Sequence, residues 1–151
     1  MRRNGFLLPI SSLPSKYGIG SFSKEAYEFV DILEEAGQKI WQILPLGPTG
    51  YSDSPYQSFS TFAGNPYFID LCELIEEGLL SEDECDSYDW GDDVEYIDYE
   101  KIYLSRFKIL KKAYKRSKIE HNKKFQAYCK YNKWWLDDYA LYMAIKDSLG
   151  G

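Results

Sequence analysis

The sequence between residues 4 and 46 follows a strand, helix, strand pattern, and no other feature of the chain restricts its fold as much. "NGFLLPI", from Asn4 to Ile10, is a short apolar run bounded by Gly and Pro, which is typical of a buried strand. Ser23 can cap a helix whose apolar residues recur at helical spacing, and Gly37 is a suitable stop. A second apolar run, Lys39 to Leu46, predicts a strand that is buried on both faces.

Two strands joined in this way run parallel, because the crossover through the helix is nearly always right-handed. The loops after parallel strands meet at the carboxyl ends of the strands, where α/β enzymes and barrels bind their ligands. We therefore expect two unusual loops to face one site: "SSLPSKYGIGS", residues 11–21, and "GPTGYSDSPYQSFSTFAGNP", residues 47–66. The fold class expected from this pattern is α/β with two parallel strands.

The remainder of the sequence is mainly helical. A short helix is expected to end near Gly78, and the acidic segment from residue 81 to residue 98 shows neither a helical nor a strand period. Three further helices are predicted, namely Tyr99 to Ser117, about Asn122 to Tyr131, and Lys133 to Leu149. The first of them has an apolar stripe formed by Tyr103, Phe107, Leu110 and Tyr114. We expect residues 1–70 to form a βαβ part that carries the long loop, and residues 71–151 to form an inserted helical subdomain.

The chain is acidic, with a formal net charge of −6 at pH 7. Binding to a nucleic-acid backbone needs a basic face, so we expect no nucleic-acid partner. The basic run from Lys108 to Arg116 places its lysines on the polar side of a helix, and a solvated face explains it better than a binding patch. Apolar segments fall short of the roughly 18 residues that a membrane span requires, and the start of the chain does not resemble a signal peptide. We expect no membrane partner and a cytoplasmic location.

Counting residues excludes several kinds of site. His121, the one histidine, lies in a polar stretch, so a histidine-rich metal site is excluded and a surface role is favoured over a catalytic one. The three cysteines are widely spaced and suggest neither a disulfide framework nor a zinc site. In "YGIGSFSKEA" Ser23 stands where a dinucleotide loop has its third glycine, so turn geometry explains the glycines better than a cofactor does. No metal and no cofactor are expected.

The long loop has the composition of a carbohydrate-binding segment. Aromatic rings match the apolar faces of sugars, and neighbouring polar side chains supply orienting hydrogen bonds. The candidates in the loop are Tyr51, Asp53, Ser54, Tyr56, Gln57 and Asn65. Because the chain has 14 tyrosines, a place in the core is the alternative for each ring, but the position on a loop favours binding.

Three segments of the sequence resemble the N-terminal portion of the amylomaltase family, the 4-alpha-glucanotransferases or disproportionating enzymes. They are "LLPISSLPSKYGIGSF", "AGQKIWQILPLGPTGYSDSPYQSFSTFAGNPYFIDL" and "WWLDDYALYMAIK", and the resemblance covers essentially all 151 residues. It implies the start of a TIM-type (β/α) barrel with an inserted helical subdomain, which agrees with the pattern above. It also implies a retaining transfer of α-1,4-glucan segments between chains, with malto-oligosaccharides and α-1,4-glucans as partners.

The same resemblance assigns roles to individual residues. Tyr56, in "SPYQ", resembles the tyrosine that stacks on the glucose unit whose bond is cleaved. The polar residues expected to bind substrate with it are Asp53, Ser54, Gln57 and Asn65. Tyr51, in "TGYSD", and Tyr103, in "DYEKIY", resemble a pair that holds a second glucan outside the active cleft.

The catalytic carboxylates of the family are the point where this sequence departs from the pattern. A retaining mechanism needs a carboxylate nucleophile and a second carboxyl group about 5 Å away. In the family both lie on later strands, and neither Asp53, Asp70, Glu73 nor the acidic segment matches their motifs. A barrel takes about 250 residues, whereas this chain has 151. We therefore expect an N-terminal fragment without catalytic residues, inactive alone, whose partner is the rest of the barrel; a stand-alone carbohydrate-binding or interaction module is the alternative.

Overall fold

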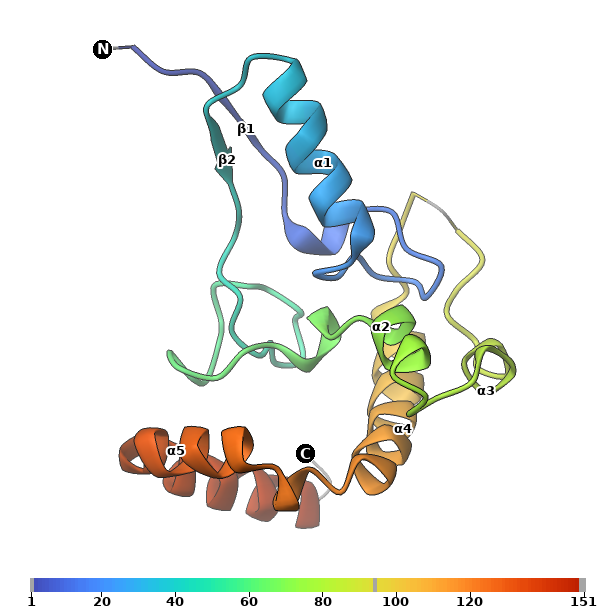
Figure 1. Ribbon diagram of the computed structural model, residues 1–151, viewed down its shortest axis with the longest axis vertical. Coiled ribbons are helices and arrows are strands. Elements are labelled where there is room, and N and C mark those ends of the chain that lie inside the picture. The colour runs from blue at the N-terminus through green and yellow to red at the C-terminus, as the bar shows by residue number, and fades with distance from the viewer. Residues whose placement is uncertain (1, 94, 150–151) are drawn as a thin grey trace. The chain divides into compact units, whose positions relative to one another are not determined.

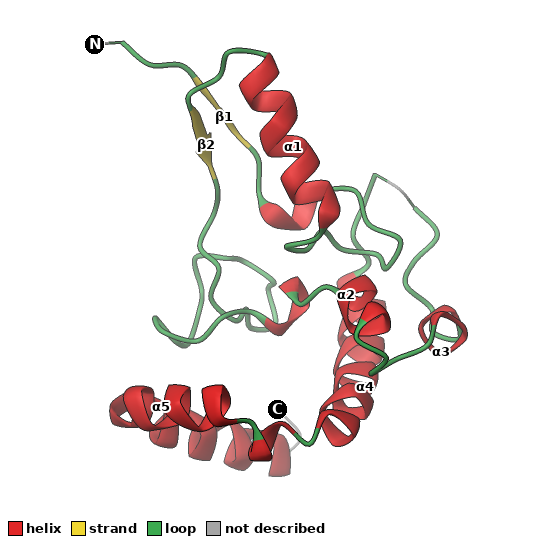
Figure 2. Cartoon of the chain, in the orientation of Figure 1, coloured by secondary structure: helices red, strands yellow, loops and turns green. Residues whose placement is uncertain are grey.

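The computed structural model describes residues 2–93 and 95–149, whose helices and strands are drawn in Figure 1 and Figure 2. The chain divides into two compact units, Met1–Ala113 and Tyr114–Gly151. This division does not coincide with the expected boundary between residues 70 and 71. The assignment of residues 71–151 to an inserted subdomain stays a prediction, and residues 94, 150 and 151 within it lie outside the described part.

A two-stranded parallel sheet opens the first unit. β1 (Gly5–Leu7) and β2 (Ile40–Gln42) pair in the register Gly5 to Ile40, Phe6 to Trp41 and Leu7 to Gln42. The helix α1 (Lys24–Glu35) connects the two strands and lies alongside them (Figure 1). The parallel pairing and the α/β class expected from the sequence are confirmed.

The strands are shorter and more exposed than the sequence predicts. The sheet has two strands within the described residues, so each strand has one neighbour and one open edge. On the side of α1 the ring of Phe29 packs against Trp41, with 5.0 Å between the ring centroids. Ile40 nevertheless remains 46% exposed and Ile43 36% exposed. The expectation that this second strand is buried on both faces is therefore wrong for this chain.

The ends of α1 follow the sequence signals only in part. Ser23 occupies the N-cap position with an extended backbone, and its carbonyl oxygen accepts a bond from the N–H of Ala26 at 3.0 Å. Its hydroxyl, however, donates to the carboxylate of Glu25 and caps no helix N–H, so the predicted side-chain cap is wrong. At the other end Gly37 has a φ of +69°, which is the left-handed conformation expected of a C-terminal glycine stop.

The glycines of "YGIGS" have steric reasons of their own. Gly18 has a φ of +75°, and a Cβ atom there would lie 2.3 Å from the carbonyl oxygen of Trp90. A Cβ on Gly20 would lie 2.1 Å from the carbonyl oxygen of Ile10. Because both contacts are with backbone atoms, which cannot move aside cheaply, turn geometry and close approach account for these glycines.

The largest buried cluster of the first unit surrounds α4 (Tyr99–Ser117). Its buried members are Tyr17, Ile19, Tyr67, Leu71, Leu80, Cys85, Trp90, Ile102, Ile109 and Ala113. A second cluster, of Ile10, Leu13 and Ala26, packs against Phe29, Trp41 and other partly buried residues. The 3-10 turn η2 (Pro66–Phe68) leads from the long loop to α2 (Leu71–Glu76), which ends before Gly78 as expected.

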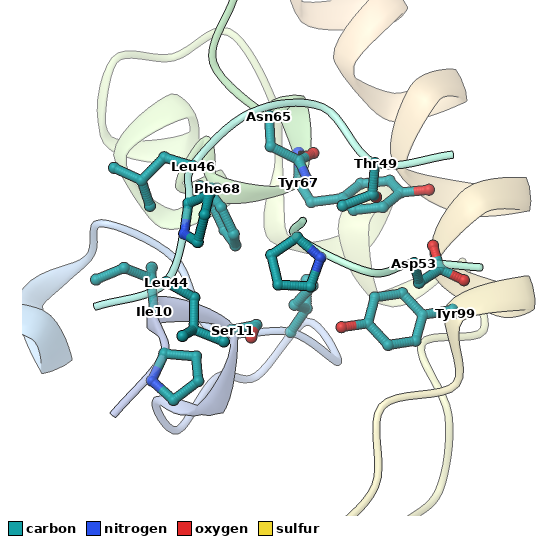
Figure 3. A pocket seen from close by; sticks show the side chains of 14 residues that line it. Ile10, Ser11, Leu44, Leu46, Thr49, Asp53, Asn65, Tyr67, Phe68 and Tyr99 are labelled. Carbon is teal, nitrogen blue, oxygen red and sulfur yellow. Dashed lines mark hydrogen bonds between the residues drawn. The ribbon is translucent and has the colours of Figure 1, made fainter. Parts of the chain in front are cut away.

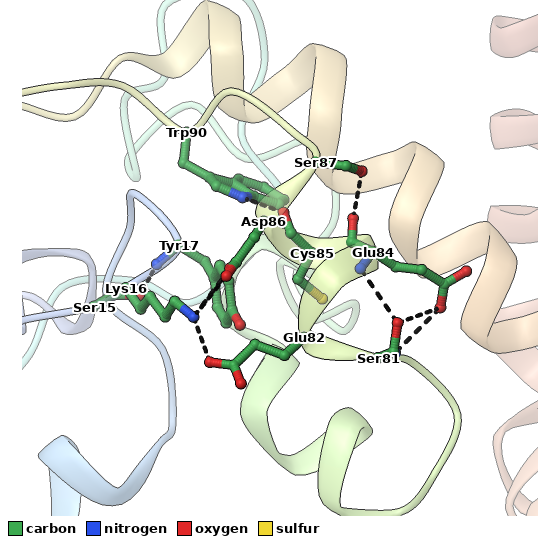
Figure 4. A network of polar contacts seen from close by, with 10 residues as sticks. All are labelled: Ser15, Lys16, Tyr17, Ser81, Glu82, Glu84, Cys85, Asp86, Ser87 and Trp90. Carbon is green, nitrogen blue, oxygen red and sulfur yellow. Dashed lines mark hydrogen bonds and ion pairs between the residues drawn. The ribbon is translucent and has the colours of Figure 1, made fainter.

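The acidic segment contains a short helix, α3 (Glu82–Asp86), which the absence of a period did not predict. Ser81 and Glu84 form a capping box, in which each side chain accepts a bond from the other residue's backbone N–H (Figure 4). Lys16 reaches the carboxylates of Glu82 at 2.5 Å and Asp86 at 3.0 Å, and so ties the 11–21 loop to α3 (Figure 4). Local capping therefore forms this helix without an apolar period.

The buried face of α4 differs from the predicted stripe. Tyr103, Phe107 and Tyr114 are 53%, 41% and 58% exposed. The face that is buried consists of Ile102, Ser105, Arg106, Ile109 and Ala113. Of the predicted stripe, Leu110 does pack against the core, but the stripe is wrong for the three tyrosine and phenylalanine positions. Two polar side chains belong to the buried face instead, and backbone carbonyls accept their hydrogen bonds.

The second unit is dominated by one helix, α5 (Lys123–Ser148), after the 3-10 turn η3 (Ile119–His121). Asn122 caps α5 by accepting bonds from the N–H groups of Lys124 and Phe125. Two helices were predicted here, but α5 continues through Asn132 without a break. The Asn132 side chain is accommodated because it donates to the carbonyl of Tyr128 at 2.9 Å and accepts from the indole of Trp135 at 3.0 Å.

The helices of the described part include none that combines the length and the apolar character needed to cross a membrane. The cytoplasmic location expected from the sequence stays a prediction.

Candidate functional site

A pocket of about 150 Å³ lies at the carboxyl ends of β1 and β2 (Figure 3). Its lining comes from four places in the chain, and the residues are Pro9, Ile10, Ser11, Ile19, Leu44, Pro45, Leu46, Thr49, Asp53, Pro55, Asn65, Tyr67, Phe68 and Tyr99. The 11–21 loop and the long 47–66 loop both contribute to it. The two loops therefore line one pocket, as expected, and the role of this pocket as a ligand site stays a prediction.

The pocket has a polar side and an apolar side. Figure 3 shows Thr49, Asp53 and the ring of Tyr99 along one side, opposite the aliphatic chains of Ile10 and Leu44. The hydroxyl oxygen of Thr49 is buried and has no hydrogen-bond partner among the described residues. A mostly apolar cleft with a few oriented polar groups is the usual form of a small-molecule site.

Asp53 is the acidic residue of this lining, and its backbone places it there. It adopts a left-handed φ of 52°, and its N–H donates to the carbonyl of Gly50 at 3.0 Å in a tight turn. Burial raises the pKa of the Asp53 carboxyl above its ordinary value. Burial also raises the pKa of Tyr67 to about 12, with a further contribution from the negative charge of Asp53. The carboxylate thus lies in a partly desolvated environment beside phenol groups.

Asn65 closes the long loop. It is 8% exposed, its N–H donates to the carbonyl of Leu46 at 2.8 Å, and its side-chain oxygen accepts from the N–H of Tyr67 at 3.0 Å. The loop end is therefore fixed to the segment that follows β2. Asn65 lines the pocket, but its side-chain oxygen is engaged with the backbone, which indicates a role in holding the wall.

The remaining loop candidates lie at the surface and outside the pocket lining. Tyr56 is 73% exposed, and its N–H donates to the hydroxyl of Ser54 at 3.4 Å. The N–H of Gln57 donates to the carbonyl of Ser54 at 3.1 Å, and its side-chain oxygen accepts from the hydroxyl of Ser52. These hydrogen bonds order the turn that carries Tyr56. The exposed ring of Tyr56 is accessible to a ligand from solvent.

The two tyrosines predicted for a second glucan are on different elements. Tyr51 is fully exposed on the loop, and Tyr103 is 53% exposed on α4. The ring of Tyr103 meets Phe107 edge-on at 5.6 Å, and Phe107 in turn lies 5.8 Å from the ring of Tyr67. Both rings are available to a ligand, and their joint role stays a prediction.

Of the residues that line the pocket, only Asp53 and Asn65 are candidates from the sequence, and three further residues matter most for its chemistry and its wall. Thr49 and Tyr99 line the pocket, and Arg106 holds its wall from α4. Tyr99 begins α4, and no local signal indicates that this helix starts beside the loop. Arg106 had a usable signal, because it falls at helical spacing from Ile102 and Ile109 on the apolar side of α4.

The pocket places hydroxyl, phenol and carboxylate groups beside apolar side chains. Within the described residues no group of three or more His, Cys, Asp or Glu side chains could hold a metal ion. Asp53 is the single carboxylate among the residues that line the pocket, whereas retaining glycoside chemistry uses two about 5 Å apart. Hydroxyls, phenols and one carboxylate beside apolar walls suit the hydroxyls and ring faces of a sugar.

Comparisons with known proteins identify the family of the chain. The chain matches the family described as 4-alpha-glucanotransferase over residues 8–151. It is 56% identical over 137 residues to a protein named 4-alpha-glucanotransferase from Clostridium butyricum, a match that covers 91% of this chain and 28% of that protein. With one from Thermus thermophilus it shares 46% identity over 154 residues, covering 99% of this chain and 30% of the relative.

A solved structure is similar over nearly the whole chain. It is an amylomaltase from Streptococcus agalactiae in complex with acarbose, with a TM-score of 0.90 and 42% identity. The match covers 99% of this chain and 30% of that chain, so this chain spans less than a third of the length of its relatives. With a family match from residue 8 to residue 151 and close similarity in both sequence and fold, the chain belongs to the 4-alpha-glucanotransferase, or amylomaltase, family.

Proposed function

We propose that this chain supplies a glucan-binding part of a 4-alpha-glucanotransferase, an enzyme that transfers α-1,4-glucan segments between chains with retention of configuration. The observation that carries the proposal is the aromatic 47–66 loop beside a pocket at the carboxyl ends of two parallel strands, in a chain of this family. The relative of known structure was solved in complex with acarbose, which supports a carbohydrate as the ligand here.

Within this proposal Tyr56 stacks on the glucose unit whose bond is cleaved. Its exposed ring and ordered turn support this role, because a rigid aromatic face binds the apolar face of a sugar at low entropic cost. Asp53, Ser54, Gln57 and Asn65 provide or orient the hydrogen bonds around that sugar. Tyr51 and Tyr103 hold a second glucan away from the pocket, a role supported by the exposure of both rings.

In this proposal β1 and β2 are the first strands of a TIM-type barrel. Residues 1–70 then belong to the barrel, and residues 71–151 form an inserted helical subdomain. Apolar side chains of the strands support this, since Phe6 and Leu7 are each 55% exposed and would be covered by further barrel elements. The two catalytic carboxylates lie on barrel strands outside these 151 residues.

Maltotriose disproportionation tests the proposal. The full-length protein that carries this chain is expected to convert maltotriose into shorter and longer sugars, and the 151-residue chain alone is expected to convert none. Transfer by the chain alone would show that its own carboxylates suffice. Failure of the full-length protein to transfer or bind would refute the activity. An open reading frame that stops after residue 151, with sugar binding by the chain, would favour the stand-alone carbohydrate-binding module.

A further inference from the structure

Arg106 is a charged side chain in the interior of the first unit. It is 1% exposed, and its Nη2 atom donates to the carbonyl oxygen of Tyr67 at 2.9 Å and to that of Ile69. Its guanidinium carbon lies 6.0 Å from the centre of the Trp90 ring. The Nε and Nη1 atoms are buried and have no hydrogen-bond partner among the described residues. A group as costly as this one calls for an explanation.

The charge of Arg106 is retained at neutral pH. Burial lowers the pKa of the guanidinium to about 10, and the nearby negative charge of Asp70 partly opposes this shift. A buried cation loses its hydration, and an apolar side chain of similar volume often fills such a place at lower cost. In return, hydrogen bonds from a cationic donor are roughly twice as strong as those from a neutral one. The buried charge of Arg106 therefore lowers the stability of the fold to some extent. In return, the carbonyl groups of Tyr67 and Ile69 are held by strong hydrogen bonds.

Those two carbonyls belong to a wall of the pocket. Tyr67 and Phe68 both line it, and the carbonyls of Tyr67 and Ile69 lie on either side of Phe68 in the chain. The N–H of Tyr67, in the same turn, donates to the side-chain oxygen of Asn65 at 3.0 Å. Arg106 lies on α4, and the same helix carries Tyr99, which also lines the pocket. Arg106 thus joins the two elements that carry these aromatic walls.

We propose that Arg106 is a positioning residue for glucan binding, whose guanidinium fixes the carbonyls of Tyr67 and Ile69 and so sets the pocket wall relative to α4. This inference rests on the proposed function, since it names glucan as the ligand of the pocket. Arg106 touches no substrate in this role and acts through Tyr67 and Phe68. Lysine replaces it incompletely, because a compact ammonium group on a flexible stem does not reproduce the planar fork.

The test compares three variants of the full-length protein. Arg106→Met removes the donors, Arg106→Lys keeps the charge, and Ile109→Val shortens a buried neighbour on the same helix without touching the carbonyls. Maltotriose affinity is measured by calorimetry, KM and kcat by disproportionation, and the melting temperature by a thermal scan. Arg106→Met is expected to raise the Kd and KM about tenfold with a much smaller change in kcat, because it removes uniform binding. Arg106→Lys should recover part of the affinity, and Ile109→Val should lower the melting temperature with Kd and KM unchanged.

The outcomes separate this inference from the proposed function. If the wild-type protein binds no maltotriose, the proposed function fails and the inference fails with it. If the wild type binds and Arg106→Met binds equally well, the positioning role alone is refuted. If Ile109→Val weakens binding as much as Arg106→Met does, general loosening of α4 explains the effect and the role is also refuted. If Arg106→Met does not fold, Arg106→Lys decides, with weaker binding supporting the role and unchanged binding overturning it.

Discussion

Trp41 donates a hydrogen bond from its indole Nε1 to the carbonyl oxygen of Leu8 at 2.9 Å. Trp41 is in β2, and Leu8 directly follows β1, so a side chain of one strand fixes the exit of the other. The N–H of Leu8 meanwhile donates to the carbonyl of Gln42 at 3.0 Å. Pro9 and Ile10, which line the pocket, come next in the chain. The strand pair therefore sets where the pocket begins.

The first prediction concerns a variant that lacks this indole hydrogen bond. Trp41→Phe keeps a ring against Phe29 and leaves the Leu8 carbonyl without its donor, which should lower the free energy of unfolding by about 1 kcal/mol. Urea denaturation followed by circular dichroism measures the loss. Tyr27→Phe is the control, because Tyr27 is 75% exposed and loss of its hydroxyl should change stability by less than about 0.5 kcal/mol. Equal effects of the two variants would show that the bond stabilises little.

The parallel strand pair could be predicted because it depends on spacing along the chain, which the sequence states directly. The burial of those strands could not be predicted, because an apolar run does not reveal how many neighbours a strand has. The buried face of α4 could not be predicted for a related reason. Ser105 and Arg106 count as polar in any hydropathy pattern, yet both are buried and donate to backbone carbonyls of distant segments. Such bonds depend on tertiary contacts.

The candidate site, like the fold, could be predicted only in part. Asp53 and Asn65 could be selected from the composition of one loop, and both line the pocket. Tyr99 could not, because it reaches the pocket from the start of α4. The predicted gap between Tyr131 and Lys133 is absent, and α5 is continuous, because the side chain of Asn132 bonds within the helix instead of competing with its backbone. Features that depend on neighbouring residues could be predicted from the sequence, whereas contacts between distant segments could not.

The second prediction concerns two glycines that are needed for different reasons. Gly20→Ala forces a Cβ into the carbonyl of Ile10 and should lower the free energy of unfolding by about 3 kcal/mol or more, as core strain does. Gly37→Ala meets no atom within 4 Å, and its left-handed backbone alone should cost about 1 kcal/mol. Chemical denaturation of both variants measures the difference. A smaller loss in the free energy of unfolding for Gly20→Ala than for Gly37→Ala would mean that the segment around Ile10 moves easily to accommodate the added methyl group.

The third prediction tests Tyr56 against a matched ring. Tyr56 and Tyr27 are 73% and 75% exposed, so replacing either by Ala should change the free energy of unfolding by less than about 0.5 kcal/mol. If the proposed function holds, glucan transfer by the full-length protein should fall in Tyr56→Ala and remain at the wild-type level in Tyr27→Ala, because stacking on the reacting sugar is proposed for Tyr56 and not for Tyr27. Kinetics and thermal melts on the same samples decide. A collapsed melt with normal turnover per folded molecule would make Tyr56 a structural residue.

The fourth prediction uses the pH dependence of Asp53. Burial raises the pKa of this carboxyl, so the folded state binds its proton more tightly than the unfolded state does. The ionised carboxylate therefore costs stability at neutral pH, and this cost disappears as the pH falls through the folded pKa. Asp53→Asn removes the charge, and Asn tolerates the left-handed φ of 52°. The variant should be more stable than the wild type at pH 7, and the difference should vanish at about pH 3, below the ordinary carboxyl pKa.

Denaturant midpoints from pH 3 to pH 7 measure this difference, with Asp53→Ala as the control. Alanine also removes the charge, but it lacks the side-chain amide that makes the left-handed backbone tolerable, so its gain at pH 7 should be smaller than that of Asn. If Asp53 accepts hydrogen bonds from sugar hydroxyls, both variants should also bind maltotriose more weakly, and Ala more so because it keeps no acceptor. An Asn variant that is less stable than the wild type at pH 7 would mean that the carboxylate makes favourable contacts that outweigh its burial.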